Sequence, residues 1–368
     1  MRIGVPRETA PGETRVSLLP AEVAALTCAG HELLVEHRAG AHLGLPDEAY
    51  SSAGALMVDR DAVFGDAELL VKVEPPLIEE VPLFSGGQIL MAFLDLPARP
   101  GLRSSLADVG VSTLPLETLT DANGELPVLA SQSGLAGRLG FLYGMYNLLG
   151  PSGGPGFYAG GLAGVPSAKV AVLGGGTAGA GAARAAVGAR ARVVVVEEDA
   201  AAAVRLDESL GGSVEVLLSC EASVRAALAG AHIVLGCAWV RGGVSPRLVD
   251  RSMMGMVADG GMIVDLAIRA GGCFETSRPT TFDDSVFLDE GVRHFCVPNL
   301  PAAAARPATG LLSRSLLPWV LRAAHGDTEG MGESGGSAAA EERASSGGRR
   351  HAFRASSDRY ASGGGLNL

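Results

Sequence analysis

Three glycines and one acid carry the clearest chemical signal in the stretch 169–199, KVAVLGGGTAGAGAARAAVGARARVVVVEED. Gly174, Gly176 and Gly179 follow a short apolar run and form the pattern G-x-G-x-x-G. Where a strand turns into a helix, the first glycine permits the tight turn, the second admits a pyrophosphate, and the third lets helix and strand pack closely. The free N–H groups at the start of the helix would face the phosphates. The stretch therefore predicts a βαβ unit that binds a dinucleotide.

Glu197 follows the second β-branched run, Val193–Val196, about twenty residues after the glycines. A carboxylate at this place accepts hydrogen bonds from a ribose diol and repels a 2′-phosphate. The sequence therefore favours NAD over NADP as the cofactor.

Repeated strand and helix patterns on both sides of this unit predict the elements that position it. Before it, apolar runs typical of buried parallel strands alternate with helical patterns. After it, the same alternation completes a doubly wound sheet. A helical pattern over 131–149 would bridge two domains, and a helix over 307–324 could return to the first. The expected strands are 2–5, 33–36, 69–73, 88–94, 111–113, 170–173, 193–196, 214–217, 233–236, 262–266 and 294–297.

Composition limits the classes of protein to be considered. A chain of 368 residues with 47% hydrophobic residues suggests about two folded domains. The net charge of -11 argues against nucleic acid or an anionic membrane as a partner. We expect a cytoplasmic protein, because no long uncharged apolar segment is present and the five cysteines are scattered without metal-binding spacing. From about Gly326 onward, Gly, Ser, Ala, Glu and Arg predominate and predict a disordered tail over 326–368.

Five segments in order resemble the alanine dehydrogenase family, which is related to the NAD-binding part of nicotinamide nucleotide transhydrogenase. They are MRIGVPRETAPGETRVSLLP, ELLVKVEPP with GQIL, the glycine pattern, DLAIRAGGCFETSRPTT and HFCVPNLP. The resemblance implies an α/β fold of two Rossmann-like doubly wound domains with the active site in the cleft between them. It places the substrate domain at 1–128 plus 305–325 and the NAD-binding domain at 129–304. It also implies a homo-oligomer, commonly a hexamer, with a small amino, keto or imino acid as substrate.

The resemblance assigns further residues to the cofactor and the substrate. Ser133 matches a serine that contacts the cofactor, and Asn299 matches an asparagine near the nicotinamide. Arg15 in GETRVSLLP matches the arginine that binds the substrate carboxylate, where a planar guanidinium can form two parallel hydrogen bonds. A surface arginine in a polar loop is the alternative for Arg15.

Three positions depart from the family's catalytic pattern. Glu74 stands where the family has a lysine, Asp95 where it has its catalytic histidine, and Arg269 where it has an aspartate. None of the seven histidines of this chain falls at that place in the pattern. Asp95 could act as a base only if burial or a neighbouring carboxylate such as Glu74 raised its pKa. Lys72 shares the strand face of Glu74, one step displaced, and could replace the missing lysine from farther back.

These departures leave three functions open. The first is an NAD-dependent oxidoreductase acting on the C–N bond of an α-amino or imino acid, with an altered substrate that carries an extra cationic group or a second carboxylate read by Arg269. The second is a lyase or deaminase that uses NAD as an internal hydride relay. The third is a catalytically silent NAD-binding protein, in which Glu74 and Asp95 are solvated acids of a decayed cleft. Arg269 could also simply pair with one of these acids.

Overall fold

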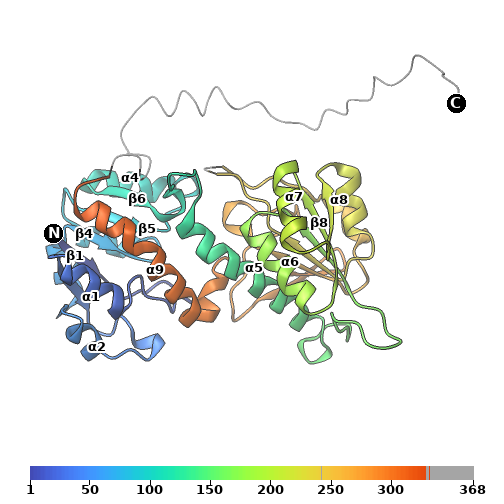
Figure 1. Ribbon diagram of the computed structural model, residues 1–368, viewed down its shortest axis with the longest axis horizontal. Helices are drawn as coiled ribbons and strands as arrows, with labels where there is room; N and C mark the ends of the chain where they lie inside the picture. The colour runs from blue at the N-terminus through green and yellow to red at the C-terminus, as the bar shows by residue number, and fades with distance from the viewer. Residues whose placement is uncertain (242, 329–330, 332–368) are drawn as a thin grey trace, which may run out of the picture. The chain divides into compact units, whose positions relative to one another are not determined.

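The computed structural model describes residues 1–241, 243–328 and 331. They form two α/β sheets, one in each half of the chain, with helices on both faces (Figure 1). The predicted tail lies outside the described residues, apart from 326–328 and 331. In the described part of the chain, no helix is long and apolar enough to span a membrane.

The first sheet is parallel throughout and has the strand order β3-β2-β1-β4-β5-β6. This is the order of a Rossmann fold, in which the direction of winding reverses between β1 and β4. Its strands and helices are β1 (Arg2–Val5), α1 (Pro20–Cys28), β2 (Glu32–Glu36), α2 (Asp47–Ser52), β3 (Leu56–Val58), α3 (Arg60–Asp66), β4 (Leu69–Val71), β5 (Ile89–Ala92), α4 (Pro100–Val109) and β6 (Ser112–Pro115).

The second sheet repeats this order and adds one antiparallel edge strand, giving β12-β13-β11-β10-β7-β8-β9. The winding reverses between β7 and β10, where ligands of open α/β sheets bind beyond the strand ends. Its elements are β7 (Lys169–Leu173), α6 (Thr177–Gly188), β8 (Arg192–Glu197), α7 (Ala200–Ser209), β9 (Glu215–Leu218), α8 (Glu221–Leu228), β10 (Ile233–Gly236), β11 (Met262–Asp265), β12 (Val286–Asp289) and β13 (Val292–Phe295).

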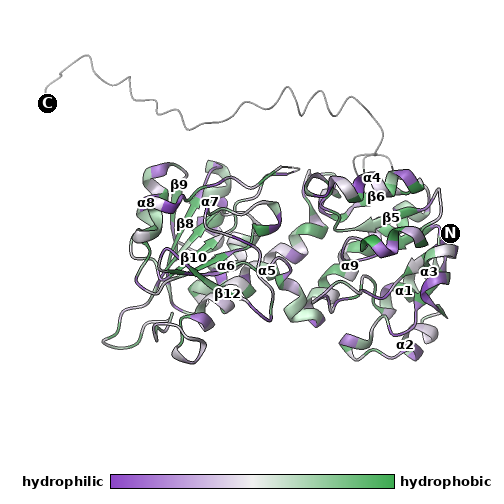
Figure 2. Cartoon of the chain, turned by 180° about the vertical axis from the view of Figure 1, so that it is seen from behind, coloured by the Kyte–Doolittle hydropathy of each residue, from purple (hydrophilic) through white to green (hydrophobic). Residues whose placement is uncertain are grey.

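Apolar side chains cover both faces of each sheet, which explains why the strands are nearly continuous hydrophobic runs. Figure 2 colours much of the strands as hydrophobic residues. Two long helices join these cores. Helix α5 (Pro127–Asn147) places Val128 in a core of the first sheet and Phe141 in a core of the second. Helix α9 (Ala305–Ala324) returns to the first sheet, where Leu312 and Leu316 are fully buried.

The structure confirms the doubly wound α/β class and corrects several element limits. The short strands β3 and β12 were not predicted, because each lies at a sheet edge and has no fully buried residue. Strand β4 ends at Val71 rather than residue 73, since the Val73 N–H donates to Glu8 Oε1 at 2.6 Å. Strand β13 starts and ends two residues earlier than expected.

Candidate functional site

The glycine turn between β7 and α6 has the form that the sequence predicts. Gly174 has φ +101°, and a Cβ there would lie 2.7 Å from the backbone nitrogen of Ala238. A Cβ at Gly179 would lie 1.8 Å from the Gly174 carbonyl oxygen, so only glycine lets the helix pack this closely on the turn. At Gly176, by contrast, a Cβ would meet nothing within 4 Å. The turn is therefore closed on the protein side and open at Gly176.

Glu197 lies at the end of β8 and points its carboxylate at this turn. Its Oε2 accepts a hydrogen bond from the Gly175 N–H at 2.5 Å. Its Oε1 accepts from the backbone N–H groups of Glu198 and Asp199, each at 2.9 Å. These bonds fix the carboxylate where a ribose diol would lie if a pyrophosphate rested on the glycines.

The start of helix α6 also fits a dinucleotide. Its N-cap residue is Gly176, and no side chain caps the first turn. The first N–H groups of the helix therefore remain available to a phosphate, together with the positive end of the helix dipole. Open space, free donors and a fixed carboxylate are the features that bind a dinucleotide.

Helix α5 lies against α6 through glycines and carries Ser133. A Cβ at Gly181 would lie 2.4 Å from the Gly134 carbonyl oxygen, and one at Gly137 would lie 1.8 Å from that of Ala178. The two backbones are thus in direct contact. Ser133, which is half-buried, lies next to this contact, and its role at the cofactor stays a prediction.

Arg15 lies in the loop after β1 and is only 4% exposed. Its Nε and Nη2 donate to the two oxygens of Glu13, at 2.9 and 2.7 Å. Its Nη1 donates to Gln132 Oε1 at 2.9 Å, and its Nη2 also donates to Asn299 Oδ1 at 2.8 Å. Asn299 in turn donates to Glu13 Oε2 at 2.7 Å. The guanidinium predicted to bind a substrate is therefore held by side chains of the protein itself.

Electrostatic interactions favour the charged forms of Glu13 and Arg15. Burial raises the pKa of Glu13, but the hydrogen bonds and the charge of Arg15 outweigh it and keep that pKa below its usual value. Burial likewise lowers the pKa of Arg15, and Glu13 more than compensates. Both side chains therefore remain ionised at neutral pH.

Glu74 connects Arg15 to the second sheet. It follows β4, is 5% exposed, and its Oε2 accepts from Arg269 Nη2 at 2.5 Å. Its Oε1 lies 3.4 Å from Arg15 Nη2. Arg269 comes from the segment after β11. One carboxylate thus has an arginine on each oxygen, and the ion pair that the sequence left open for Arg269 is formed with Glu74.

Asp95 lies beyond the end of β5, and its carboxylate remains available for a hydrogen bond. Its backbone is left-handed, with φ +48°, which is uncommon for a residue other than glycine. Its N–H donates to Glu117 Oε1 at 2.7 Å, and the N–H of Leu94 donates to Glu117 Oε2 at 3.2 Å. Among the residues that the structure describes, none donates a hydrogen bond to the Asp95 carboxylate.

Burial raises the pKa of Asp95, and the nearby charges of Arg269 and Arg99 oppose this only in part. Glu74 is not a cause of the shift, so of the two possibilities that the sequence offered, burial is the one at work. Burial also raises the pKa of Glu117. Asp95 is therefore a weaker acid than a solvated aspartate.

Lys72 is occupied by a separate buried group of charges. Its Nζ lies 3.3 Å from Glu8 Oε2 and 3.4 Å from Glu80 Oε2, and the side chain is 1% exposed. Glu80 also pairs with Arg60. This places the amine of Lys72 against acids other than Glu74.

The histidines of the described residues do not join the cluster of Arg15, Glu74, Asp95 and Arg269. His294, for example, is fully buried and bonds Thr276 Oγ1 and the carbonyl of Val292. No hydrogen bond links the cluster to any of the histidines within 1–241, 243–328 and 331, namely His31, His37, His42, His232, His294 and His325.

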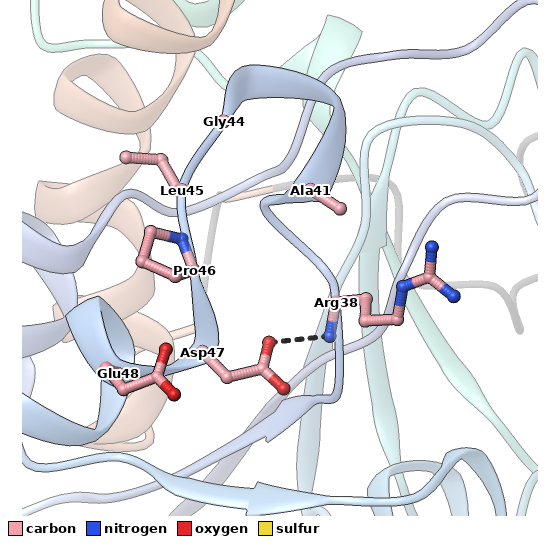
Figure 3. A pocket seen from close by; sticks show the side chains of 7 residues that line it. All are labelled: Arg38, Ala41, Gly44, Leu45, Pro46, Asp47 and Glu48. Atoms are coloured by element: carbon pink, nitrogen blue, oxygen red, sulfur yellow. Dashed lines mark hydrogen bonds between the residues drawn. The ribbon is translucent and has the colours of Figure 1, made fainter.

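The surface depression drawn in Figure 3 shares no residue with this cluster. It has a volume of about 360 Å³ and lies at the start of α2, where the Arg38 N–H donates to Asp47 Oδ1 at 2.7 Å. It gives no functional group to the site described above.

The sequence did not indicate three residues that shape the site: Glu13, Gln132 and Glu117. Glu13 had a signal, because it lies two residues before Arg15 in an extended segment, where alternate side chains share a face. Gln132 and Glu117 approach their partners from far along the chain. Only the fold reveals them.

Comparisons with known proteins indicate the same family over most of the chain. The family model "Alanine dehydrogenase/PNT, N-terminal domain" matches residues 4–136, and "Alanine dehydrogenase/PNT, C-terminal domain" matches 141–338. An alanine dehydrogenase of Mycobacterium tuberculosis is 40% identical over 328 residues, which cover 89% of this chain and 88% of that protein. One of Halomonas elongata is 38% identical and covers 87% of each chain.

Two solved structures are also similar. An L-alanine dehydrogenase superposes with a TM-score of 0.83 at 37% identity, covering 90% of this chain and 91% of that one. A transhydrogenase from Sinorhizobium meliloti gives a TM-score of 0.76 at 27% identity, covering 87% and 93%. The chain therefore belongs to the alanine dehydrogenase/PNT family.

Proposed function

We propose that this protein is an NAD-dependent oxidoreductase that acts on the C–N bond of an amino or imino compound other than alanine. Membership of the alanine dehydrogenase/PNT family supports the class of reaction and the use of NAD. The observation that carries the cofactor assignment is the open glycine turn with Glu197 fixed beside it. The altered substrate rests on Glu74, Asp95 and Arg269, which replace a lysine, a histidine and an aspartate of the family pattern.

We assign substrate binding and dinucleotide binding to different parts of the chain. We assign the substrate to residues 1–128 and 305–325, and the dinucleotide to 129–304, with Ser133 and Asn299 near the nicotinamide. Arg15 and Glu74 come from the first part, and Arg269 from the second. A cytoplasmic homo-oligomer, as the resemblance implies, is part of this proposal.

Asp95 is the residue that we propose as the base. Oxidation of an amine requires the ammonium group to lose a proton and the carbon that bears it to lose a hydride, which leaves an iminium ion. The glycine turn and Glu197 would hold the NAD that supplies the hydride acceptor. Asp95 would take the ammonium proton, since its carboxylate has no donor among the described residues and its pKa is raised by burial. Water would then convert the iminium ion into a carbonyl compound and ammonium, and the protonated Asp95 would release its proton to solvent.

The strained backbone of Asp95 supports this role. A left-handed conformation costs a residue other than glycine about 1 kcal/mol or more, and such strain is concentrated at functional sites. Glu117 accepts from the N–H of Leu94 and from that of Asp95 itself, and acts as a positioning residue for the aspartate.

A spectrophotometric assay tests the proposal. We expect the protein with NAD⁺ to form NADH from at least one member of a panel of amines and amino acids. Asp95→Asn should lower kcat by about 100-fold or more while the affinity for NADH is unchanged. Asparagine tolerates the left-handed backbone, so this variant should fold. Asp108→Asn, on the exposed side of α4, is the control. Equal kcat for Asp95→Asn and the wild type would exclude Asp95 as the base.

The other two functions are distinct outcomes of the same experiment. Retention of tightly bound NAD with turnover but no net NADH would identify a lyase or deaminase. NADH binding without turnover of any compound in the panel would identify a silent dinucleotide-binding protein.

A further inference from the structure

Glu74 occupies the position that an anionic ligand would take between two arginines. Arg15 reaches one oxygen of its carboxylate and Arg269 the other, at 3.4 and 2.5 Å. Two guanidinium groups that converge from different elements form a receptor for a single carboxylate. Here the chain itself supplies that carboxylate.

Most of the other donors of Arg15 are also in use. Glu13 takes two of its N–H groups, Gln132 a third, and Asn299 shares a fourth. An incoming carboxylate that is to bind both arginines would therefore have to displace Glu74, which is 5% exposed and cannot leave without exposing a buried arginine. Removing one partner of a buried ion pair is strongly unfavourable.

The charge that is left over favours a cation. Glu13 and Glu74 balance Arg15 and Arg269, so these four groups are together neutral. Asp95 and Glu117 add two carboxyl groups next to them and Arg99 adds one guanidinium, and Asp95 has no donor among the described residues. An ammonium group fits this surplus, whereas a second carboxylate would be repelled.

We propose that Glu74 is a built-in carboxylate ligand of Arg15 and Arg269, and that the site selects an amine without a carboxylate beside its amino group. This rests on the proposed function, since it concerns the substrate of the same reaction. In this arrangement Glu74 supplies from within the chain the anion that an amino acid would otherwise bring. The sequence left open a substrate with an extra cationic group or with a second carboxylate. This proposal differs from both, because the substrate keeps its amino group and lacks the carboxylate.

Alanine and isopropylamine are matched probes, because they differ only by a carboxylate in place of a methyl group. Their affinities are measured by calorimetry with the NADH complex of the full chain, in which the amine cannot be oxidised. We expect the wild type to bind isopropylamine more tightly than alanine. In Glu74→Ala the place between the two arginines is vacant, and alanine should bind about 100-fold more tightly than it does to the wild type.

Glu74→Gln is the second variant and should show the same direction if Glu74→Ala is unstable. Glu79→Ala removes an exposed acid of the neighbouring segment and should behave as the wild type. Alanine binding to the wild type as tightly as to both Glu74 variants would overturn the role of Glu74. A wild-type preference for alanine over isopropylamine would overturn the substrate class. Failure to bind NADH at all, measured first in the same titration, would instead refute the proposed function.

Discussion

At the scale of single residues, the site is determined by which groups are already engaged. Arg15 and Arg269 are the cations to which a substrate anion would bind, and both contact Glu74. Asp95 is the acid without such a partner in the described structure. Both arginines are therefore held by a carboxylate of the chain itself, whereas the Asp95 carboxylate has no donor among the described residues.

Glu197 provides a prediction at this scale. Glu197→Gln keeps an oxygen that can accept from the Gly175 N–H but removes the charge that would repel a 2′-phosphate. We expect the preference for NADH over NADPH to fall by about tenfold, a loss typical of one partly screened charge interaction. Fluorescence titration with both cofactors measures the ratio. Glu198→Gln, an exposed neighbour, should leave it unchanged, and an unaltered ratio in Glu197→Gln would refute the assignment.

At the scale of elements, two substitutions in the turn between β7 and α6 should affect stability and NADH binding separately. Gly179→Ala would place a Cβ 1.8 Å from a carbonyl oxygen and should destabilise the protein by about 3 kcal/mol. Gly176→Ala meets open space, and its φ of -60° suits alanine, so stability should be retained. The new methyl group would block the pyrophosphate, and NADH binding should be lost. Thermal unfolding and NADH titration of both variants check this contrast; normal NADH affinity in Gly176→Ala would contradict it.

The sequence predicted the elements that are buried and periodic. Strands β1 and β10 fall at the expected residues, because apolar runs mark them locally. Edge strands β3 and β12 carry no such signal, since part of each lies against solvent. Helix α5 starts at Pro127, four residues before the expected start, where proline suits a first turn.

The sequence identifies residues of the candidate site, but it does not identify the side chains with which they interact. The sequence indicates that Glu74, Asp95 and Arg269 are unusual, because they sit in segments that resemble a family. It does not indicate that Glu74 joins two arginines, since these lie 59 and 195 residues away along the chain. Long-range pairing of charges depends on how two sheets meet, which no local pattern encodes.

At the scale of the whole molecule, buried Glu8 links stability to pH. Burial raises its pKa from 4.5 to about 7, although Lys72 opposes the shift. The folded protein therefore holds a proton that the unfolded chain releases near pH 4.5. This contribution to the free energy of unfolding is fully present below pH 4.5 and is lost as the pH rises through about 7.

Glu8→Gln tests this linkage. Glutamine can still accept from the Val73 N–H but does not titrate. Between pH 5 and pH 8, we expect the wild type to lose roughly 1–3 kcal/mol of stability relative to Glu8→Gln, as two-state unfolding in urea would show. Glu48→Gln, an exposed acid, should follow the wild type. Parallel pH profiles for Glu8→Gln and the wild type would show that Glu8 is ionised in the folded protein.

The glycines of α5 have a consequence for how the protein acquires its structure. Gly134, Gly137, Gly140 and Gly144 let this helix touch α6 and the second sheet, but each lowers intrinsic helix propensity by about 1 kcal/mol relative to alanine. An isolated peptide of this sequence would be a random coil. Helix α5, which connects the two halves, thus becomes ordered only on a surface formed by residues that follow it. Strands β7 to β11 must therefore be synthesised before the two halves can pack together.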